Sequence, residues 1–185
     1  MKLLTYTNQE FPADLKCQVL SFLRIVFWEG FTGENRLRDW ITAERHHPLH
    51  FVLVENGLVV SHTEVVWKYL EHAGQTYKTY GLTGVLTFPS FRHEGYGLQV
   101  VRAATDWIAA SDADIGMFHC NPALQGFYAR CGWMPMAGAV TLTGPRESPN
   151  VSSEQMMMQF FTEKGRLGRE RFERLPVYFD EDDTW

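Results

Sequence analysis

The sequence of 185 residues lacks the features on which several large classes of protein depend. Its three cysteines are odd in number and lack metal-ligand spacing, so the pattern indicates neither a disulfide framework nor a zinc motif. The 17 basic and 22 acidic residues give a formal charge of −5 without the basic stripe typical of nucleic-acid-binding proteins. No apolar run is long enough to span a membrane. With 45% hydrophobic residues, the chain is expected to form one packed domain over residues 1–185.

The cysteines and the N-terminus indicate a cytoplasmic location. Cys17, Cys120 and Cys131 lie in apolar helix-like or strand-like contexts, so we expect buried thiols in a reducing compartment. The start at Met1 turns polar within a few residues, and we therefore expect no signal peptide.

A cluster of histidines at His46, His47 and His50 surrounds Pro48. Proline breaks the helical spacing that a metal site of this kind would use. We therefore expect an exposed loop here and no metal.

The hydrophobic pattern predicts an α/β chain, of the α+β type, with a mixed sheet that has helices on both faces. Asn56-Gly57 is the strongest short hairpin signal in the chain. The predicted order is β-α-α-β-β-β-α-β-α-β-β. The predicted strands cover 3–7, 50–55, 58–69, a long strand ending at Pro89, 113–120, 137–142 and 155–162; the predicted helices cover 12–28, a segment ending at about Ala43, 98–110, and a segment from Asn121 to Gly132.

The most informative stretch runs from Arg92 to Gly97, between the strand-like run 80–88 and the helix-like run 98–110. The first N–H groups of a helix have no partner within the helix and lie at the positive end of its dipole. Glycines let a diphosphate approach that backbone closely. The arrangement therefore predicts a nucleotide-type cofactor, although an ordinary glycine-rich turn has the same appearance.

Two well-known phosphate-binding motifs are excluded at this loop. A P-loop would need Lys and Ser or Thr after Gly97, and neither follows. A dinucleotide-binding loop would need a third glycine where Val100 stands. What remains is the pattern R-x-x-G-x-G.

A second motif follows a short apolar strand. Asn121-Pro122 starts a helix, since asparagine caps well and proline suits the first helical position. The helix carries Phe127-Tyr128, and Gly132-Trp133 follows, with Gly132 placed to end it in a left-handed conformation.

Together these two motifs, in this order, resemble the signatures of the GNAT superfamily of N-acetyltransferases. Within that superfamily the chain resembles the aminoglycoside 2'-N-acetyltransferases along nearly all its length. The residues that carry this likeness are 57–62, Gly84-Val85, Tyr128, Gly132-Trp133, 143–145 and Asp183-Thr184-Trp185. The resemblance implies the GNAT fold, acetyl-coenzyme A as cofactor, and acetyl transfer to an amine.

The resemblance also implies which residues hold the cofactor. Backbone N–H groups of Val85, Leu86 and Thr87 would bind the pantetheine arm as an added strand and polarise the thioester. The diphosphate would lie on the loop formed by Arg92, His93, Glu94, Gly95, Tyr96 and Gly97, with Asn121 also near the cofactor. Arg92 has the alternative of facing solvent.

Tyr128 occupies the position of the family's general acid. A free thiol has a pKa of about 8.5 and a tyrosine about 10, so a tyrosine hydroxyl can protonate the departing sulfur. The alternative is a half-buried helix aromatic without a chemical role.

For the general base, the family pattern is not followed. The family's acid lies just before Gly84, where this chain has Thr83, which cannot act as a base at neutral pH. Three replacements stay open: His119, Glu64, and the terminal carboxylates acting through water. His119 has a suitable ordinary pKa, about 6.5.

By resemblance, the acceptor would be a small amine, most simply a polycationic one such as an aminoglycoside or a polyamine. Thr83, Gly84, Glu29, Asp39, Asp183 and Trp185 are the implied acceptor-binding residues, and 172–185 would be a tail docking at that site. Two alternatives stay open, a protein or peptide N-acetyltransferase and a non-catalytic acyl-CoA-binding module. A homodimer is also expected by resemblance.

Overall fold

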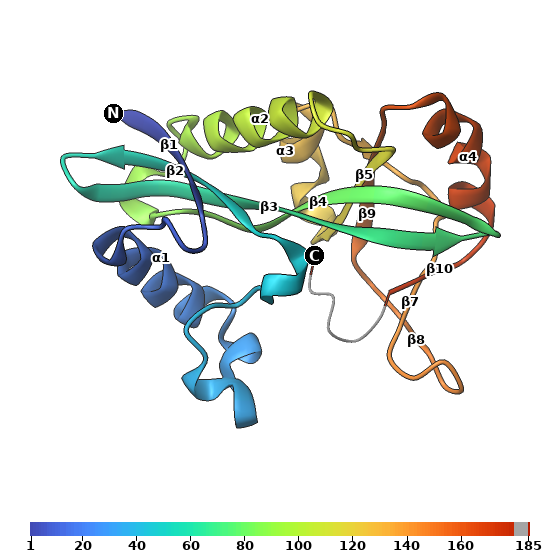
Figure 1. The fold of residues 1–185 in the computed structure, drawn as a ribbon, viewed down its shortest axis with the longest axis horizontal. Coiled ribbons are helices and arrows are strands. Elements are labelled where there is room, and N and C mark those ends of the chain that lie inside the picture. The colour runs from blue at the N-terminus through green and yellow to red at the C-terminus, as the bar shows by residue number, and fades with distance from the viewer. Residues whose placement is uncertain (180–184) are drawn as a thin grey trace. The chain divides into compact units, whose positions relative to one another are not determined.

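A computed structural model describes residues 1–179 and Trp185 (Figure 1). The chain divides into two compact units. The first unit comprises Met1–Val66 and Leu82–Ala104, and the second comprises Trp67–Gly81 and Thr105–Trp185. Strands β3 (Leu58–His72) and β4 (Gln75–Thr87) and helix α2 (Tyr96–Ala109) each contribute residues to both units. The units are described separately below.

The first unit is built on the strand order β1-β2-β3-β4. Strand β1 (Lys2–Thr7) pairs antiparallel with β2 (Leu49–Glu55), and β2 pairs antiparallel with β3. The turn between β2 and β3 has φ values of 48° at Asn56 and 78° at Gly57, as the Asn-Gly signal predicts. The predicted hairpin is therefore confirmed.

Helix α1 (Ala13–Val26) supplies the core of this unit (Figure 1). Its apolar residues recur at helical spacing, so that Leu15, Val19, Phe22 and Leu23 are all buried on one face. They form a cluster with strand residues such as Val52 and Val59. The predicted helix 12–28 is confirmed but is shorter at each end.

The second predicted helix, ending at about Ala43, is wrong. The structure has three 3₁₀ turns instead, η1 (Trp28–Phe31), η2 (Gly33–Leu37) and η3 (Glu44–His46). Residues 32–37 are all exposed, so this segment has no apolar face that could hold an α-helix against the core. Arg24 fixes the segment, because its guanidinium donates to the carbonyls of Arg36 at 2.9 Å and Arg38 at 2.6 Å.

The second unit has the strand order β4-β5-β9-β6. Strand β4 pairs parallel with β5 (Ile115–Cys120), and both β5 and β6 (Met134–Pro135) pair antiparallel with β9 (Gln155–Phe160). A small separate sheet has the order β10-β7-β8, where β10 is Val177–Tyr178, β7 is Thr141–Thr143 and β8 is Asn150–Val151. The predicted mixed sheet is thus confirmed. The strand predicted over 137–142 is wrong in its bounds, because the paired strand β7 begins only at Thr141.

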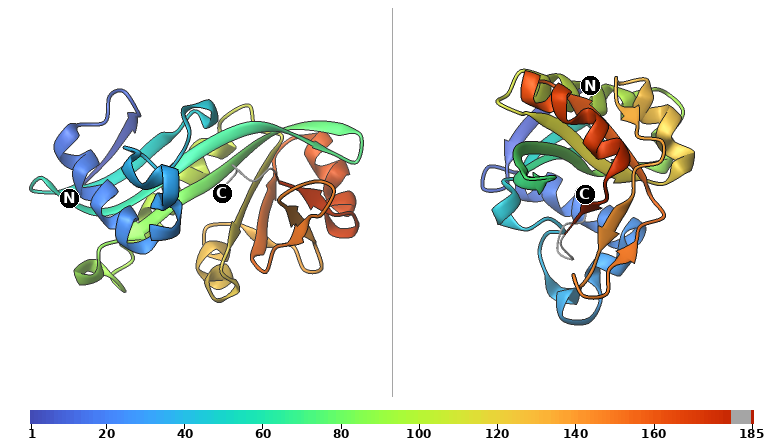
Figure 2. Two further views of the ribbon diagram at one scale, coloured as in Figure 1. Left: turned by 90° about the horizontal axis from the view of Figure 1, so that it is seen from below. Right: turned by 90° about the vertical axis from the view of Figure 1, so that its right-hand side faces the viewer.

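Helix α4 (Glu163–Arg174), which the sequence prediction missed, packs against β9 (Figure 2). Its N-terminus is capped by Thr162, whose Oγ1 accepts from the N–H of Gly165 at 3.1 Å. Only three of its twelve residues are buried, namely Gly165, Gly168 and Phe172. Two of them are glycines, so the sequence shows no apolar stripe at helical spacing. The predicted tail 172–185 therefore begins inside this helix and continues into β10.

The remaining helices of this unit follow β5. Asn121 caps the 3₁₀ turn η5 (Pro122–Leu124) by accepting from the N–H of Ala123 at 2.9 Å, and α3 (Gln125–Ala129) follows directly. Gly132 has φ 87°, the left-handed conformation that the sequence predicted after this helix.

Two expectations about individual side chains are wrong. Cys17 is exposed, because it lies off the buried face of α1, whereas Cys120 and Cys131 are buried. His46 and His50 are buried and not in an exposed loop, since His50 belongs to β2 and is fully enclosed.

Within the described residues, none of the helices has the length and hydrophobicity to cross a bilayer. A single domain over 1–185 stays a prediction.

Candidate active site

In the first unit, Gly84 interrupts the regular conformation of β4. Its φ is +56°, a left-handed value that glycine adopts without strain and that is typical of a bulge. A Cβ at this position would lie 2.9 Å from Oε1 of Glu64, so only glycine leaves room for that carboxylate. Thr83 and Val85, on either side, are both half-buried.

The end of β4 is held by side chains of its own unit. Ser61 Oγ donates to the carbonyl of Leu86 at 2.7 Å and lies 2.9 Å from Oγ1 of Thr87. Arg92 is exposed, and its Nε donates to the carbonyl of Thr87 at 3.1 Å. Arg92 therefore ties the start of the loop to the strand that precedes it.

The loop itself is shaped by two left-handed residues. His93 has φ 68° and Gly95 has φ 86°, and both are exposed together with Glu94. Helix α2 begins at Tyr96, and its first internal hydrogen bond runs from the N–H of Gln99 to the carbonyl of Gly95 at 3.1 Å. The predicted layout of strand, glycine-containing loop and helix start is thus confirmed.

Two of the predicted loop residues interact with each other. The hydroxyl of Tyr96 is hydrogen-bonded to the carboxylate of Glu94, which raises the pKa of that tyrosine. Gly97 follows in the first helical turn, so Tyr96 and Gly97 present main-chain N–H groups that lack a partner four residues earlier in the helix. This is the geometry that a phosphate requires.

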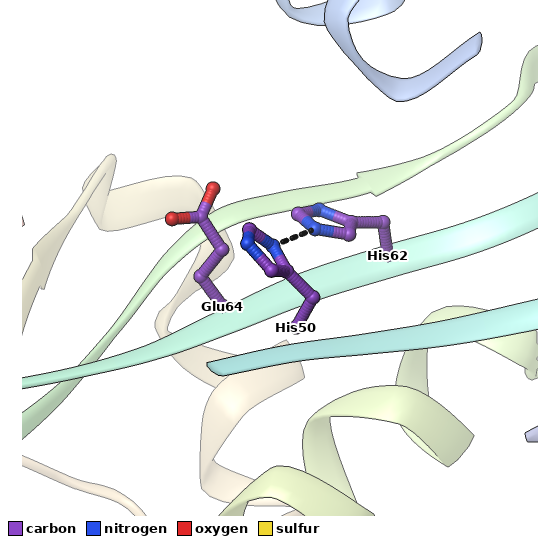
Figure 3. A group of neighbouring side chains, drawn as sticks. All are labelled: His50, His62 and Glu64. Atoms are coloured by element: carbon purple, nitrogen blue, oxygen red, sulfur yellow. Dashed lines mark hydrogen bonds between the residues drawn. The ribbon is translucent and has the colours of Figure 1, made fainter. Parts of the chain in front are cut away.

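A buried polar cluster lies directly beside Gly84 (Figure 3). It comprises His50 on β2 and His62 and Glu64 on β3, where His50 and Glu64 are cross-strand partners. All three are fully buried, and their ligand-type atoms lie within 4.8 Å of one another. Because side chains two residues apart on a strand share a face, His62 and Glu64 point to the same side of the sheet.

Hydrogen bonds fix the two imidazoles. Nδ1 of His62 donates to the carbonyl of Gly84 at 2.9 Å, and Nε2 of His62 lies 3.1 Å from Nδ1 of His50. Nε2 of His50 lies 3.1 Å from Oδ1 of Asn8. Burial lowers the pKa of His62 to about 4 and that of His50 to about 2, so both rings are neutral at neutral pH.

Glu64 differs from its two neighbours in how its carboxylate is held. Oε1 accepts from Nε1 of Trp40 at 3.0 Å, and the hydroxyl of Thr42 interacts with the carboxylate and lowers its pKa, whereas no hydrogen bond of standard geometry reaches the buried Oε2 from the described residues. Burial raises the pKa of Glu64 to about 7. The carboxyl group therefore changes charge near neutral pH.

Two predicted acceptor residues lie elsewhere in this unit, on the segment after α1. Glu29, in η1, is exposed. Asp39 is exposed and forms an ion pair with Lys16 at 3.5 Å. Neither residue belongs to the buried cluster around Glu64.

In the second unit, Tyr128 is buried in α3, with 6% of its surface exposed. Its ring packs edge-on against Phe118, with the ring centres 4.7 Å apart. Burial is the largest cause of a raised pKa for Tyr128, to which the neighbouring Cys120 and Cys131 contribute. The hydroxyl therefore keeps its proton at any physiological pH.

The same unit places His119 at the half-buried end of β5. Its Nδ1 lies 3.1 Å from the main-chain oxygen of Trp185, which can only accept, so this nitrogen donates. Its Nε2 lies 2.8 Å from Oγ1 of Thr141. Burial lowers the pKa of His119, and both ring nitrogens are engaged.

Trp185 is itself buried against the first half of β4. Its ring lies so close to Gly81 that no Cβ would fit there, and it packs edge-on against Phe179 at 5.8 Å between ring centres. Nζ of Lys68 lies 5.4 Å from the ring centre. Of the predicted tail residues, Trp185 is thus docked on its own unit, whereas Asp183 lies outside the described residues.

The predicted site residues therefore fall into two groups. The first unit holds Thr83, Gly84, Val85–Thr87, the loop 92–97, Glu29 and Asp39, and the second holds His119, Asn121, Tyr128 and Trp185. From the sequence, Glu64 is only one of three candidate bases, and nothing in it indicates Trp40 and His62 as neighbours of Glu64. A strand with one exposed face alternates polar and apolar residues, and such a pattern would have shown which residues face the cluster. Residues 61–66 are all buried, so this strand has no such alternation.

Comparison with solved structures shows which fold these units belong to. The chain is similar to Escherichia coli ElaA, with a TM-score of 0.60 and 14% identity over 85% of this chain and 98% of that one. It is also similar to the E. coli acetyltransferase YhbS in complex with CoA (TM-score 0.57, 14% identity, 97% and 89% covered). A GNAT family acetyltransferase from Brucella melitensis in complex with acetyl-CoA gives 0.55, with 18% identity and 87% and 89% covered.

A search of the curated proteins found no match. The model described as the acetyltransferase (GNAT) family matches residues 18–133, which is more than half of the chain and includes both predicted motifs. The chain belongs to the acetyltransferase (GNAT) family.

Proposed function

We propose that this protein is an acetyl-CoA-dependent N-acetyltransferase that acetylates a primary amine of a small, polycationic acceptor. The observation that carries the proposal is the loop 92–97 at the start of α2 within a chain of the GNAT family. Two solved proteins of similar fold are in complex with CoA or acetyl-CoA. The net charge of −5 suits a cationic acceptor.

In this proposal the cofactor is held by main-chain groups. The end of β4, Val85 to Thr87, binds the pantetheine arm, and the loop 92–97 binds the diphosphate through N–H groups and the helix dipole. Asn121 contributes near the cofactor from the second unit. The exposed left-handed Gly95 supports this assignment, since a Cβ added there would meet nothing within 4 Å and the backbone is open to a ligand.

Transfer is direct, from the thioester to the amine. The amine nitrogen attacks the thioester carbonyl carbon and gives up one proton to a base, a C–N bond forms, the C–S bond breaks, and Tyr128 gives its hydroxyl proton to the sulfur. Cys120 is a poor covalent nucleophile because burial raises the pKa of its thiol to about 11, so little thiolate is present at neutral pH. Direct transfer is therefore favoured over an acetyl-cysteine intermediate.

The acceptor, in this proposal, is bound by Thr83, Gly84, Glu29, Asp39 and the end of the chain, Asp183 and Trp185. An aminoglycoside or a polyamine has the charge and the primary amines that these groups suit. The homodimer and the cytoplasmic location stay predictions.

The test is a free-thiol release assay with acetyl-CoA against aminoglycosides, polyamines, amino acids and short peptides. A variant lacking Thr184 and Trp185 is assayed in parallel. The proposal expects turnover of polycationic amines by the full chain and its loss in the shortened one. Turnover of peptides alone would favour a protein or peptide acetyltransferase, and CoA binding without turnover of any amine would favour a non-catalytic binding module.

A further inference from the structure

The proposed reaction needs a group that takes a proton from the amine, and two of the expected groups are poorly suited. Thr83 has only a hydroxyl, and its main-chain oxygen accepts from Oγ1 of Thr63 at 3.3 Å. His119 has both ring nitrogens engaged, by Trp185 and Thr141. A base must have an unengaged lone pair, and neither residue offers one of adequate strength.

Glu64 has such a lone pair. Its Oε2 is the atom of the buried cluster that no hydrogen bond of standard geometry reaches from the described residues, whereas all four ring nitrogens of His50 and His62 are engaged. Its Oε1 is fixed by Nε1 of Trp40. Trp40 therefore orients the carboxylate through Oε1, while the buried Oε2, near the hydroxyl of Thr42, keeps a lone pair that can take a proton.

The position of the carboxylate relative to Gly84 is the second observation. Glu64 Oε1 would lie 2.9 Å from a Cβ on Gly84, so the carboxylate occupies the space beside the irregular residue of β4. Thr83, where the family resemblance placed an acid, is the residue immediately before Gly84. Strand β3 thus places the Glu64 carboxylate beside Gly84 of β4, next to the position where β4 has Thr83 and no acid.

The charges that face this carboxylate leave it able to take a proton. From β2 and β3, His50 and His62 are held neutral by burial, and Trp40 contributes a neutral donor. From α1, Lys16 lies 5.7 Å from the Trp40 ring centre, where it is paired with Asp39. No cation within 4.0 Å of Glu64 is found in the described residues, and burial accordingly raises its pKa to about 7.

We propose that the carboxylate of Glu64 accepts the amine proton during acetyl transfer, in place of an acid at Thr83. This inference rests on the proposed function. The amine N–H bond breaks and its proton passes to Oε2 of Glu64, directly or through one water, as the C–N bond forms. The C–S bond breaks, the sulfur takes its proton from Tyr128, and the proton on Glu64 later returns to solvent and thence to the phenolate. Trp40 is a positioning residue, because its Nε1 donates to Oε1 of Glu64.

The test uses Glu64→Gln, which keeps the shape of the side chain and the acceptor for Trp40. General-base catalysis is worth about 10²- to 10⁴-fold, so kcat/KM should fall by about that factor while CoA binding is unchanged. Glu71→Gln is the matched control, since Glu71 lies on the same strand, is exposed, and has no assigned role. Thermal unfolding and CoA titration show whether each variant is folded.

A rescue variant separates a chemical from a structural role. Glu64→Gln combined with Thr83→Glu places a carboxylate at the position implied by the family, and it should recover at least tenfold of the lost kcat/KM. The kcat/KM of the wild type should rise as pH increases through neutral pH. With the same acceptor, the kcat/KM of Glu64→Gln should not show that rise.

Three results overturn the inference, and they differ from one another. Wild-type turnover that Glu64→Gln leaves within about threefold overturns the base alone. Absence of wild-type turnover with every amine overturns the proposed function and the base together. Tight Zn²⁺ binding that requires His50, His62 and Glu64, with activity that EDTA removes and Zn²⁺ restores, would show that the cluster is a metal site.

Discussion

The same physical cause acts on two ionisable groups of this protein with opposite chemical results. In the first unit, burial raises the pKa of Glu64 to about 7, which brings an ordinarily acidic group to the pH at which it can both take and release a proton. In the second unit, burial raises the pKa of Tyr128 above its ordinary value of 10.0, so that its proton is retained throughout the physiological pH range. Desolvation always disfavours the charged form.

The comparison teaches that the direction of a shift does not by itself assign a role. An acid whose pKa moves toward neutral can take up a proton and release it again at neutral pH. An acid whose pKa moves away from neutral keeps its proton in contact with solvent. The partners differ accordingly. Glu64 interacts with two polar neighbours, Trp40 and Thr42, whereas Tyr128 packs against an aromatic ring and lies near two cysteines.

The largest expected effect comes from Tyr128→Phe, which removes the proposed donor. We expect kcat to fall by about 10²- to 10⁴-fold with CoA affinity unchanged, because the ring that packs against Phe118 is retained. Thiol release and calorimetric titration with CoA measure the two quantities. Tyr69→Phe, at an exposed tyrosine of the same unit, is the control. Equal activity of Tyr128→Phe and wild type would remove the acid from the account.

The next effect is on stability. The pKa of Glu64 is about 7 in the folded state and 4.5 ordinarily, so the folded protein binds more protons than the unfolded chain between these values. Stability must therefore fall as pH rises from about 4.5 to 7, by about 3 kcal/mol at most. Urea unfolding at pH 5 and pH 8 should show this loss in the difference between the wild type and Glu64→Gln, which should shrink as pH rises.

The histidines are the internal control for that measurement. Their pKa values are lowered by burial, so their contribution is present above about 6.5 and is lost as pH falls. It is common to wild type and Glu64→Gln and cancels in the difference. A difference between the two proteins that does not depend on pH would contradict the raised pKa of Glu64.

A smaller effect is expected from Gly84→Ala. The left-handed φ costs a residue with a Cβ about 1–2 kcal/mol, and the new methyl group also displaces the Glu64 carboxylate. Gly57→Ala is the matched control, because Gly57 has φ 78° and nothing within 4 Å of an added Cβ. Gly84→Ala should lose more stability in urea than Gly57→Ala, because only its methyl group meets a buried side chain, and only Gly84→Ala should lose activity. Similar activity losses would show that strain alone is responsible.

The smallest effect is that of Trp40→Phe, which removes the hydrogen bond to Oε1 of Glu64. A hydrogen bond to the charged form lowers a pKa, so its removal should raise the pKa of Glu64 further, by about one unit or less. The alkaline shift appears in the pH dependence of kcat/KM. A profile that stays in place would show that Trp40 does not act through Glu64.

Much of the first unit could be predicted from local signals. Asn56-Gly57 specifies a two-residue hairpin by its backbone preferences, and α1 follows from apolar residues at helical spacing. Gly132 ends its helix as a residue without Cβ should. In each of these cases a few neighbouring residues determine the structure, so the sequence is sufficient.

What the sequence did not specify depends on residues far apart. The segment 28–46 has apolar residues at no regular spacing, and it is held by Arg24. Helix α4 buries two glycines against Asp114 and Tyr77, a contact that no pattern of hydrophobic residues shows. The pairing of Glu64 with Gly84 follows from how β3 and β4 lie side by side. Sequence alone named Glu64, but only contacts between strands distinguish it from His119.

Burial raises the pKa of the Glu64 carboxyl to about 7, and a direct titration of this group is the sharpest test of its role as a base. The measurement is the ¹³C chemical shift of the Glu64 carboxyl carbon between pH 4 and 9, assigned by its absence in Glu64→Gln. We expect a midpoint near 7. A midpoint near 4.5, the ordinary value, would contradict it, because the carboxylate would then be too weak a base for the proposed role.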